Sequence, residues 1–172
     1  MMKPVLTVTV AVFAAVFALT QPVTAADSFG ARLRGLEEVP PISTVGQGFF
    51  FASLNDAETQ LDYTLVYLGT ESTVTQSHIH IGQTSVNGGI VLFLCTNLTP
   101  PAGVPVPPAC PNGVSNTVTG TLTAANVIVQ TAQGIATGEL AEVIRAMRSG
   151  FAYANVHSTT YPGGEIRGQI SR

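Results

Sequence analysis

Residues 60–68, with the sequence QLDYTLVYL, decide the fold class. Apolar or aromatic side chains stand at every second position from Leu61 to Tyr67, and polar Gln60, Asp62 and Thr64 alternate with them. Successive side chains of a β-strand point to opposite faces of a sheet. The alternation therefore predicts a strand with one buried face and one polar face.

Seven further stretches have the same character. They are rich in Val, Ile, Thr, Phe and Tyr, and they are separated by Gly, Asn, Asp or Pro. Short strands at regular spacing are typical of antiparallel β-sandwiches and Greek-key barrels. We therefore predict an all-β fold of this kind, whose further strands cover residues 30–36, 47–54, 73–81, 89–95, 117–123, 151–157 and 165–170.

Residues 139–148 have a different periodicity. Their apolar side chains recur at i, i+3, i+4 and i+7, which is the pattern of one helix face: Leu140, Val143, Ile144 and Met147. We expect Thr137 to cap the start of this short helix and Gly150 to follow its last turn. The helix is expected to cover one open end of the barrel.

The composition excludes several classes of function. Of the 172 residues only 10% are charged, and the formal net charge is −3, so no basic surface for nucleic acid is expected. The hydrophobic content of 45% excludes a disordered chain, and the length allows one domain. Motifs of zinc proteases, of serine hydrolases and of phosphate-binding loops are missing.

The first 25 residues predict a secretory signal peptide. Lys3 supplies the positive charge, residues 5–19 form an uncharged apolar run, and small residues precede a cut after Ala25 or Ala26. A run of about 15 residues is shorter than the roughly 20 that a membrane span needs. The domain is thus expected to cover residues 26–172 of a secreted or periplasmic protein without a membrane span. Removal of the signal peptide would delete Lys3, the only lysine of the chain, and would exclude lysine-dependent catalysis.

Cys95 and Cys110 are the only cysteines. In an oxidising compartment an even pair predicts a disulfide, here at the base of a proline-rich excursion between two strands. A two-thiolate metal site is the alternative.

The chain has three histidines, and all lie in predicted strands: His78, His80 and His157. In the sequence SHIHI at 77–81, the two imidazoles share one strand face and the isoleucines share the other. Because the isoleucines belong in the core, we expect the imidazoles to face a polar surface. His157 shares a strand face with Asn155.

Three imidazoles gathered on one patch form a candidate site for Cu(II) or Zn(II). The patch requires the three strands around 73–81, 151–157 and 165–170 to be neighbours. Asn155, Glu165 and Arg167 would then surround the ligands, with Glu165 orienting an imidazole and Arg167 pairing with Glu165 or attracting an anion. Nitrogens about 3–3.5 Å apart would fit a shared ion. The alternative, in which the imidazoles make only structural hydrogen bonds, stays open at this point.

Several segments together resemble the CHRD domain, named after chordin. They are LEEVPP at 36–41, SHIHIG at 77–82, NGGIV at 87–91, and GFAYANVHS at 150–158 with PGGEIRGQI at 162–170. The resemblance implies a secreted immunoglobulin-like β-barrel without an assigned activity. The HIHIG and GGEIRGQI pieces also resemble copper–zinc superoxide dismutase locally, but three histidines are too few for the dismutase metal sites.

We therefore predict a secreted, non-catalytic binding module with a copper or zinc ion on the three histidines. Its partner would be that ion or an envelope or extracellular protein. A metal-free interaction or structural domain of the envelope or matrix is the alternative, and a dismutase-like redox enzyme is the third reading.

Overall fold

The computed structural model describes residues 27–100 and 102–172. The predicted signal peptide lies outside these residues. Within them, eight strands and one α-helix are connected by loops and by the 3-10 helices η1 (Gly35–Glu37), η2 (Ala124–Asn126) and η3 (Thr131–Gln133). The elements are β1 (Ser28–Arg34), β2 (Gln47–Leu54), β3 (Gln60–Leu68), β4 (Val74–Ile81), β5 (Gly89–Thr96), β6 (Asn116–Thr123), α1 (Leu140–Arg148), β7 (Ala152–Ser158) and β8 (Ile166–Gln169). The predicted strands are confirmed, with shifts of one or two residues at several ends.

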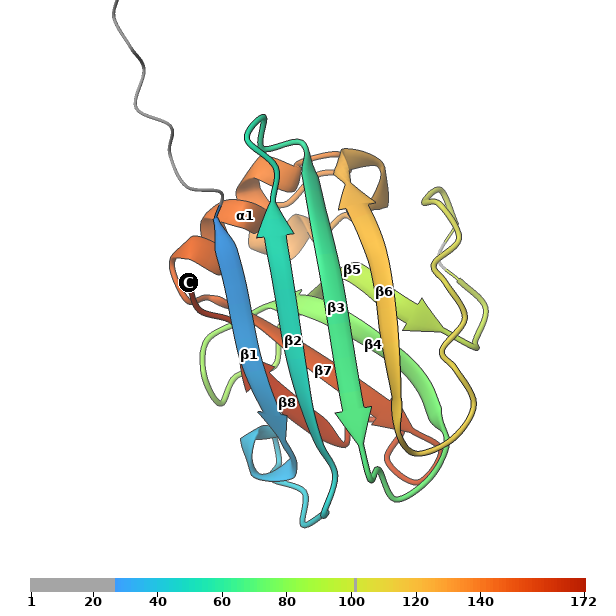
Figure 1. The fold of residues 1–172 in the computed structure, drawn as a ribbon. Helices are drawn as coiled ribbons and strands as arrows, with labels where there is room; N and C mark the ends of the chain where they lie inside the picture. The colour runs from blue at the N-terminus through green and yellow to red at the C-terminus, as the bar shows by residue number, and fades with distance from the viewer. Residues whose placement is uncertain (1–26, 101) are drawn as a thin grey trace, which may run out of the picture.

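The strands form one antiparallel sheet in the order β5-β4-β7-β8-β1-β2-β3-β6. The sheet curls into a nearly closed barrel, with β1, β2, β3 and β6 in one layer and β4, β5, β7 and β8 in the layer behind it (Figure 1). The Tyr63 hydroxyl on β3 donates a hydrogen bond to the Leu94 carbonyl on β5 over 2.5 Å and so ties the two layers together. The predicted all-β fold is confirmed.

The core lies between the layers. From the front layer, Leu61 and Leu65 point into it and are fully buried. From the rear layer, Ile79, Val156 and Ile166 are fully buried as well. The alternation that predicted β3 thus describes a strand with one face on this core.

Helix α1 lies at the end of the barrel where β1 begins (Figure 1). The four apolar side chains of its predicted face are all buried. Gly150 follows the helix with φ 73°, as expected. The predicted Thr137 cap is wrong, because the helix starts after Glu139, whose carboxylate accepts a hydrogen bond from the Ala136 amide instead.

Cys95 and Cys110 form the predicted disulfide, which excludes the two-thiolate metal site. The bond closes the proline-rich excursion between β5 and β6. Asn97 also bridges its base, because its side-chain amide donates to the Cys110 carbonyl over 3.0 Å. No helix in the described ranges is long and apolar enough to cross a membrane.

Candidate metal centre

The order of the rear layer brings the three histidines together. Strand β7 lies between β4 and β8, as the candidate site requires. In the β4–β7 register His78 stands opposite Asn155 and Gln76 stands opposite His157, so that His157 is the diagonal neighbour of His78. Asn155 in turn stands opposite Arg167 of β8. The three imidazoles therefore share one face of adjacent strands, and this prediction is confirmed.

The potential ligand atoms of His78, His80 and His157 lie within 4.8 Å of one another. Atoms with this spacing stand at most about 2.8 Å from the centre of their triangle, whereas metal–imidazole bonds are about 2.0 Å long. The 4.8 Å between ligand atoms exceeds the nitrogen–nitrogen distance of roughly 3–3.5 Å in a site that already holds its ion. A shift of each ring by less than about 1 Å would therefore bring all three nitrogens onto one ion.

The histidine face is an interior, which corrects the expected polar surface. The exposed fractions of His78, His80 and His157 are 0%, 7% and 7%. Every residue of β7 is buried, on both faces of the strand. One face packs on the core. On the other, His80 and His157 contact the backbone of Gly88 and Pro162 in the loops after β4 and β7. Strand alternation separates two faces, but it does not reveal that loops cover one of them.

Hydrogen bonds define which nitrogens carry protons. The Nδ1 atoms of His80 and His157 lie 2.9 Å from the carbonyls of Gly88 and Pro162. A carbonyl only accepts, so Nδ1 of His157 donates and its Nε2 carries a lone pair. His80 faces oxygen acceptors at both nitrogens, because Oδ1 of Asn155 lies 3.2 Å from its Nε2, and its one proton is assigned to the nearer carbonyl, that of Gly88. Nε2 of His78 lies 3.2 Å from the side-chain oxygen of Gln76, which leaves Nδ1 of His78 as an acceptor.

The lone pairs lie inside the protein. Nδ1 of His78 and Nε2 of His157 are buried and have no hydrogen-bond partner among the described residues. Burial, with smaller contributions from the neighbouring His157 and His80, lowers the pKa of His78 to about 2. Burial also lowers the pKa of His80 to about 4 and depresses the pKa of His157. All three imidazoles are thus neutral near pH 7, which is the form that binds metals.

Aromatic groups that the sequence analysis missed complete the walls. The Tyr153 ring stacks on His80 with centroids 4.6 Å apart and an angle of 5°. The Arg167 guanidinium lies 3.4 Å from the centroid of the same ring, so the ring is held between an imidazole and a cation. The Phe93 ring meets His78 edge-on at 4.3 Å. Tyr153 shares its strand face with Asn155 and His157, and this alternation was the available signal.

Three residues were predicted to surround the histidines, namely Asn155, Glu165 and Arg167. Of these, only Asn155 has a side chain next to an imidazole nitrogen, as predicted. Its Oδ1 lies 3.2 Å from Nε2 of His80. Glu165 instead accepts hydrogen bonds from the Thr44 hydroxyl over 2.8 Å and from the Glu71 amide over 2.7 Å. Glu165 therefore orients neither His80 nor His157, whose Nδ1 atoms contact backbone carbonyls.

Arg167 also differs from the expectation. In the described part of the chain it forms no ion pair with Glu165. Its guanidinium donates to the Asn87 side chain and to the carbonyls of Gln83 and Val86, over 3.2, 3.0 and 2.9 Å. Arg167 thus fixes the loop that covers the histidine face.

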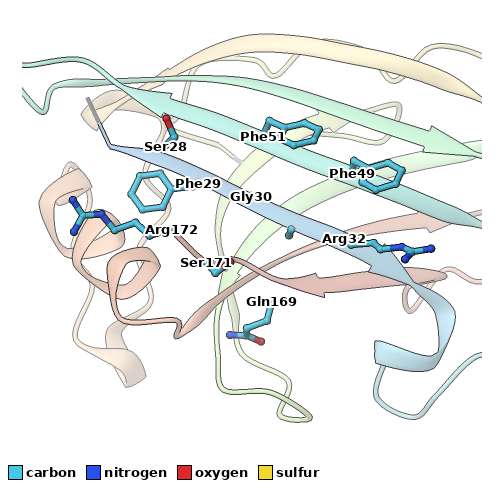
Figure 2. A pocket seen from close by; sticks show the side chains of 10 residues that line it. Ser28, Phe29, Gly30, Arg32, Phe49, Phe51, Gln169, Ser171 and Arg172 are labelled. Carbon is cyan, nitrogen blue, oxygen red and sulfur yellow. The ribbon is translucent and has the colours of Figure 1, made fainter. Parts of the chain in front are cut away.

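A separate hollow of about 500 Å³ lies on the outside of β1 and β2 beside the C-terminal residues (Figure 2). Phe49, Phe51, Arg32 and Arg172 are among its lining side chains, and none of the three histidines belongs to it. The candidate metal centre is therefore a different site from this surface hollow.

Comparisons with known proteins agree with the fold. The family model of the CHRD domain matches residues 29–170, and none of the curated proteins or solved structures compared with the chain matches it. The matched range includes all eight strands except the first residue of β1, together with the three histidines. The chain therefore belongs to the CHRD domain family.

Proposed function

We propose that this domain binds one copper or zinc ion through His78, His80 and His157. The observation that carries the proposal is the pair of buried, unpartnered acceptors, Nδ1 of His78 and Nε2 of His157, in a cluster within 4.8 Å. A buried acceptor without a donor costs about 1–3 kcal/mol, and one cation satisfies several at once. The Nδ1–carbonyl hydrogen bonds of His80 and His157 orient their rings as the outer groups of metal sites do.

The proposed role is that of an exported, non-catalytic binding module. The CHRD family supports a binding module, and the disulfide together with the predicted signal peptide supports secretion or export to the periplasm. The ion, or an extracellular protein that recognises the domain, would be its partner.

Calorimetric titration of the metal-free protein with Zn(II) and with Cu(II) tests the proposal. We expect one ion per chain at micromolar metal. His80→Ala should weaken the affinity at least tenfold. Thr119→Ala, which changes an exposed side chain on the other layer, is the matched control and should leave the affinity unchanged.

Absence of binding at micromolar metal would contradict the proposal and favour the metal-free interaction domain. That alternative predicts that a triple histidine-to-alanine variant keeps its partner in pull-downs from the source envelope. A dismutase would require the copper-loaded protein to convert superoxide faster than aqueous copper does, and we expect that it does not.

A further inference from the structure

The candidate donors carry no negative charge that would balance a bound ion. All three donors are neutral imidazoles, and the metal-ligating cluster found among the described residues contains no carboxylate and no thiolate. The ion must therefore enter a buried site with its charge uncompensated. The cost of burying a charge rises with its square, so a divalent ion costs about four times as much as a monovalent one.

Two of the candidate donor atoms are also shielded from bulk solvent. Nδ1 of His78 and Nε2 of His157 each expose less than 1 Å². Zn(II) in proteins takes four ligands, with water in the fourth position where the protein supplies three. The polar side chain that borders His80 is the Asn155 amide, whose Oδ1 lies 3.2 Å from Nε2 of the ring. A d¹⁰ monovalent ion such as Cu(I) is stable with two or three nitrogen ligands and needs no fourth.

A buried cation, the Arg167 guanidinium, lies close to His80. Arg167 is 1% exposed, and its guanidinium covers the Tyr153 ring that stacks on His80. Glu38 is the acid whose charge interacts with Arg167, and burial raises the pKa of Glu38 to about 7. Near neutral pH this carboxyl is therefore only partly ionised and compensates Arg167 incompletely. The local field opposes each additional positive charge on the bound ion.

We infer that the three-histidine site is selective for Cu(I) over Zn(II) and Cu(II). The inference rests on the proposed metal-binding function and adds the oxidation state of the ion. Asn155 and Arg167 are its positioning and selectivity residues: Asn155 places a neutral amide beside His80, and Arg167 adds positive charge behind the Tyr153 ring.

Competitive loading tests the selectivity. The metal-free protein is incubated without oxygen with equal amounts of Cu(I) and Zn(II), desalted, and its metal content is measured. We expect about one copper per chain and at least tenfold less zinc. Zinc equal to or above copper would overturn the inference while leaving the proposed function intact. Retention of neither metal would instead overturn the proposed function.

Asn155→Asp is the sharper variant, because it adds one negative charge beside His80 with little change in shape. The copper-to-zinc ratio should shift at least tenfold toward zinc. The matched control is Thr119→Asp, which adds the same charge to the exposed face of the other layer and should leave the ratio unchanged. An unchanged ratio in a folded, metal-binding Asn155→Asp protein would overturn the role of charge.

A measurement on the unmodified protein covers the case in which Asn155→Asp does not fold. After loading with Cu(I) and exposure to air, the copper should stay silent in electron paramagnetic resonance. One equivalent of a Cu(II) signal from bound copper would overturn the inference.

Discussion

The outer faces of the two layers differ, although both are built from alternating strands. On β3, the side chains that point away from the core are half-buried or exposed. On β7, the corresponding side chains are as buried as the core itself. The first face is in contact with water, and the second is covered by loops and forms a polar interior. The comparison teaches that alternation in a strand defines two faces but not what covers them.

The polar interior has its own physical basis. Arg167 holds the loop after β4 by three hydrogen bonds, and the Pro162 and Gly88 carbonyls accept from the imidazoles. Polar side chains under such a cover must find partners inside the protein. Two of the imidazole nitrogens do not find one in the described residues, and a metal ion would supply it.

Acid should separate the two regions, because it acts on the histidines of the polar interior. His78 and His80 have folded-state pKa values of about 2 and about 4, below the ordinary 6.5, so the unfolded chain binds more protons. Their stabilisation is present above pH 6.5 and is lost as the pH falls toward the folded values. Between pH 6.5 and 5, the contribution of each of these two histidines to the unfolding free energy falls by about 2 kcal/mol. The depressed pKa of His157 acts in the same direction, and the raised pKa of Glu38 acts in the opposite direction.

Denaturant titrations of the metal-free protein across this pH range should therefore show a net fall in unfolding free energy of about 2 kcal/mol, because Glu38 offsets about half of the loss from His78 and His80. His78→Leu serves as the control, because it should remove about one proton from the pH dependence. A stability that is flat between pH 6.5 and 5 would show that the histidines are hydrated and that the face is not an interior.

Leu65→Ala is the corresponding change in the water-facing layer, where it opens a cavity in the core. Leu65 is 0% exposed, and we expect a loss of about 3 kcal/mol in unfolding free energy. Metal affinity should stay within twofold, because Leu65 lies in a layer that contributes no histidine. A large loss of metal affinity in the folded variant would show that the two regions are coupled.

Arg167→Met should cost less, about 2 kcal/mol, because it removes hydrogen bonds but fills much of the same space. Amide exchange of the loop around Asn87 should accelerate with it, as this loop loses its fixed donors. Arg32→Met on the exposed face of β1 is the matched control, with an expected change within about 0.5 kcal/mol. Equal effects of the two substitutions would contradict the distinction between the faces.

His78→Leu should have the smallest effect on stability, a gain of up to about 1 kcal/mol in the metal-free protein. The substitution removes a buried nitrogen without a partner and keeps an apolar side chain of similar size. Metal binding should be lost at the same time. A strong destabilisation would indicate that the cluster is a structural network, in which the imidazole partners matter more than an ion.

Much of the fold follows from periodicity. The bounds of β2 and β3 agree with their predicted ranges, because alternation and turn residues are local properties. The apolar face of α1 was predictable for the same reason. The N-cap of α1 could not be predicted. Residues 136–139 form a turn in which the Ala136 amide donates to the Glu139 carboxylate, and Glu139 is therefore the N-cap residue.

The site was predictable only in part. That His78 and His80 share a face is a local consequence of strand geometry, and the adjacency of β4 and β7 was a premise that the structure bears out. The roles of Glu165 and Arg167 could not be deduced, because their partners Thr44, Glu71 and Asn87 lie far away in sequence.

The amino-acid sequence by itself determined the strands, the helix face, the cysteine pair and the identity of the three histidines, since each depends on spacing along the chain. Only the tertiary structure decided that loops bury the histidine face, which nitrogens keep a free lone pair, and that Tyr153 and Arg167 stack behind His80. The physical reason is that burial and electrostatic environment depend on segments far apart in sequence, whose approach no local pattern encodes.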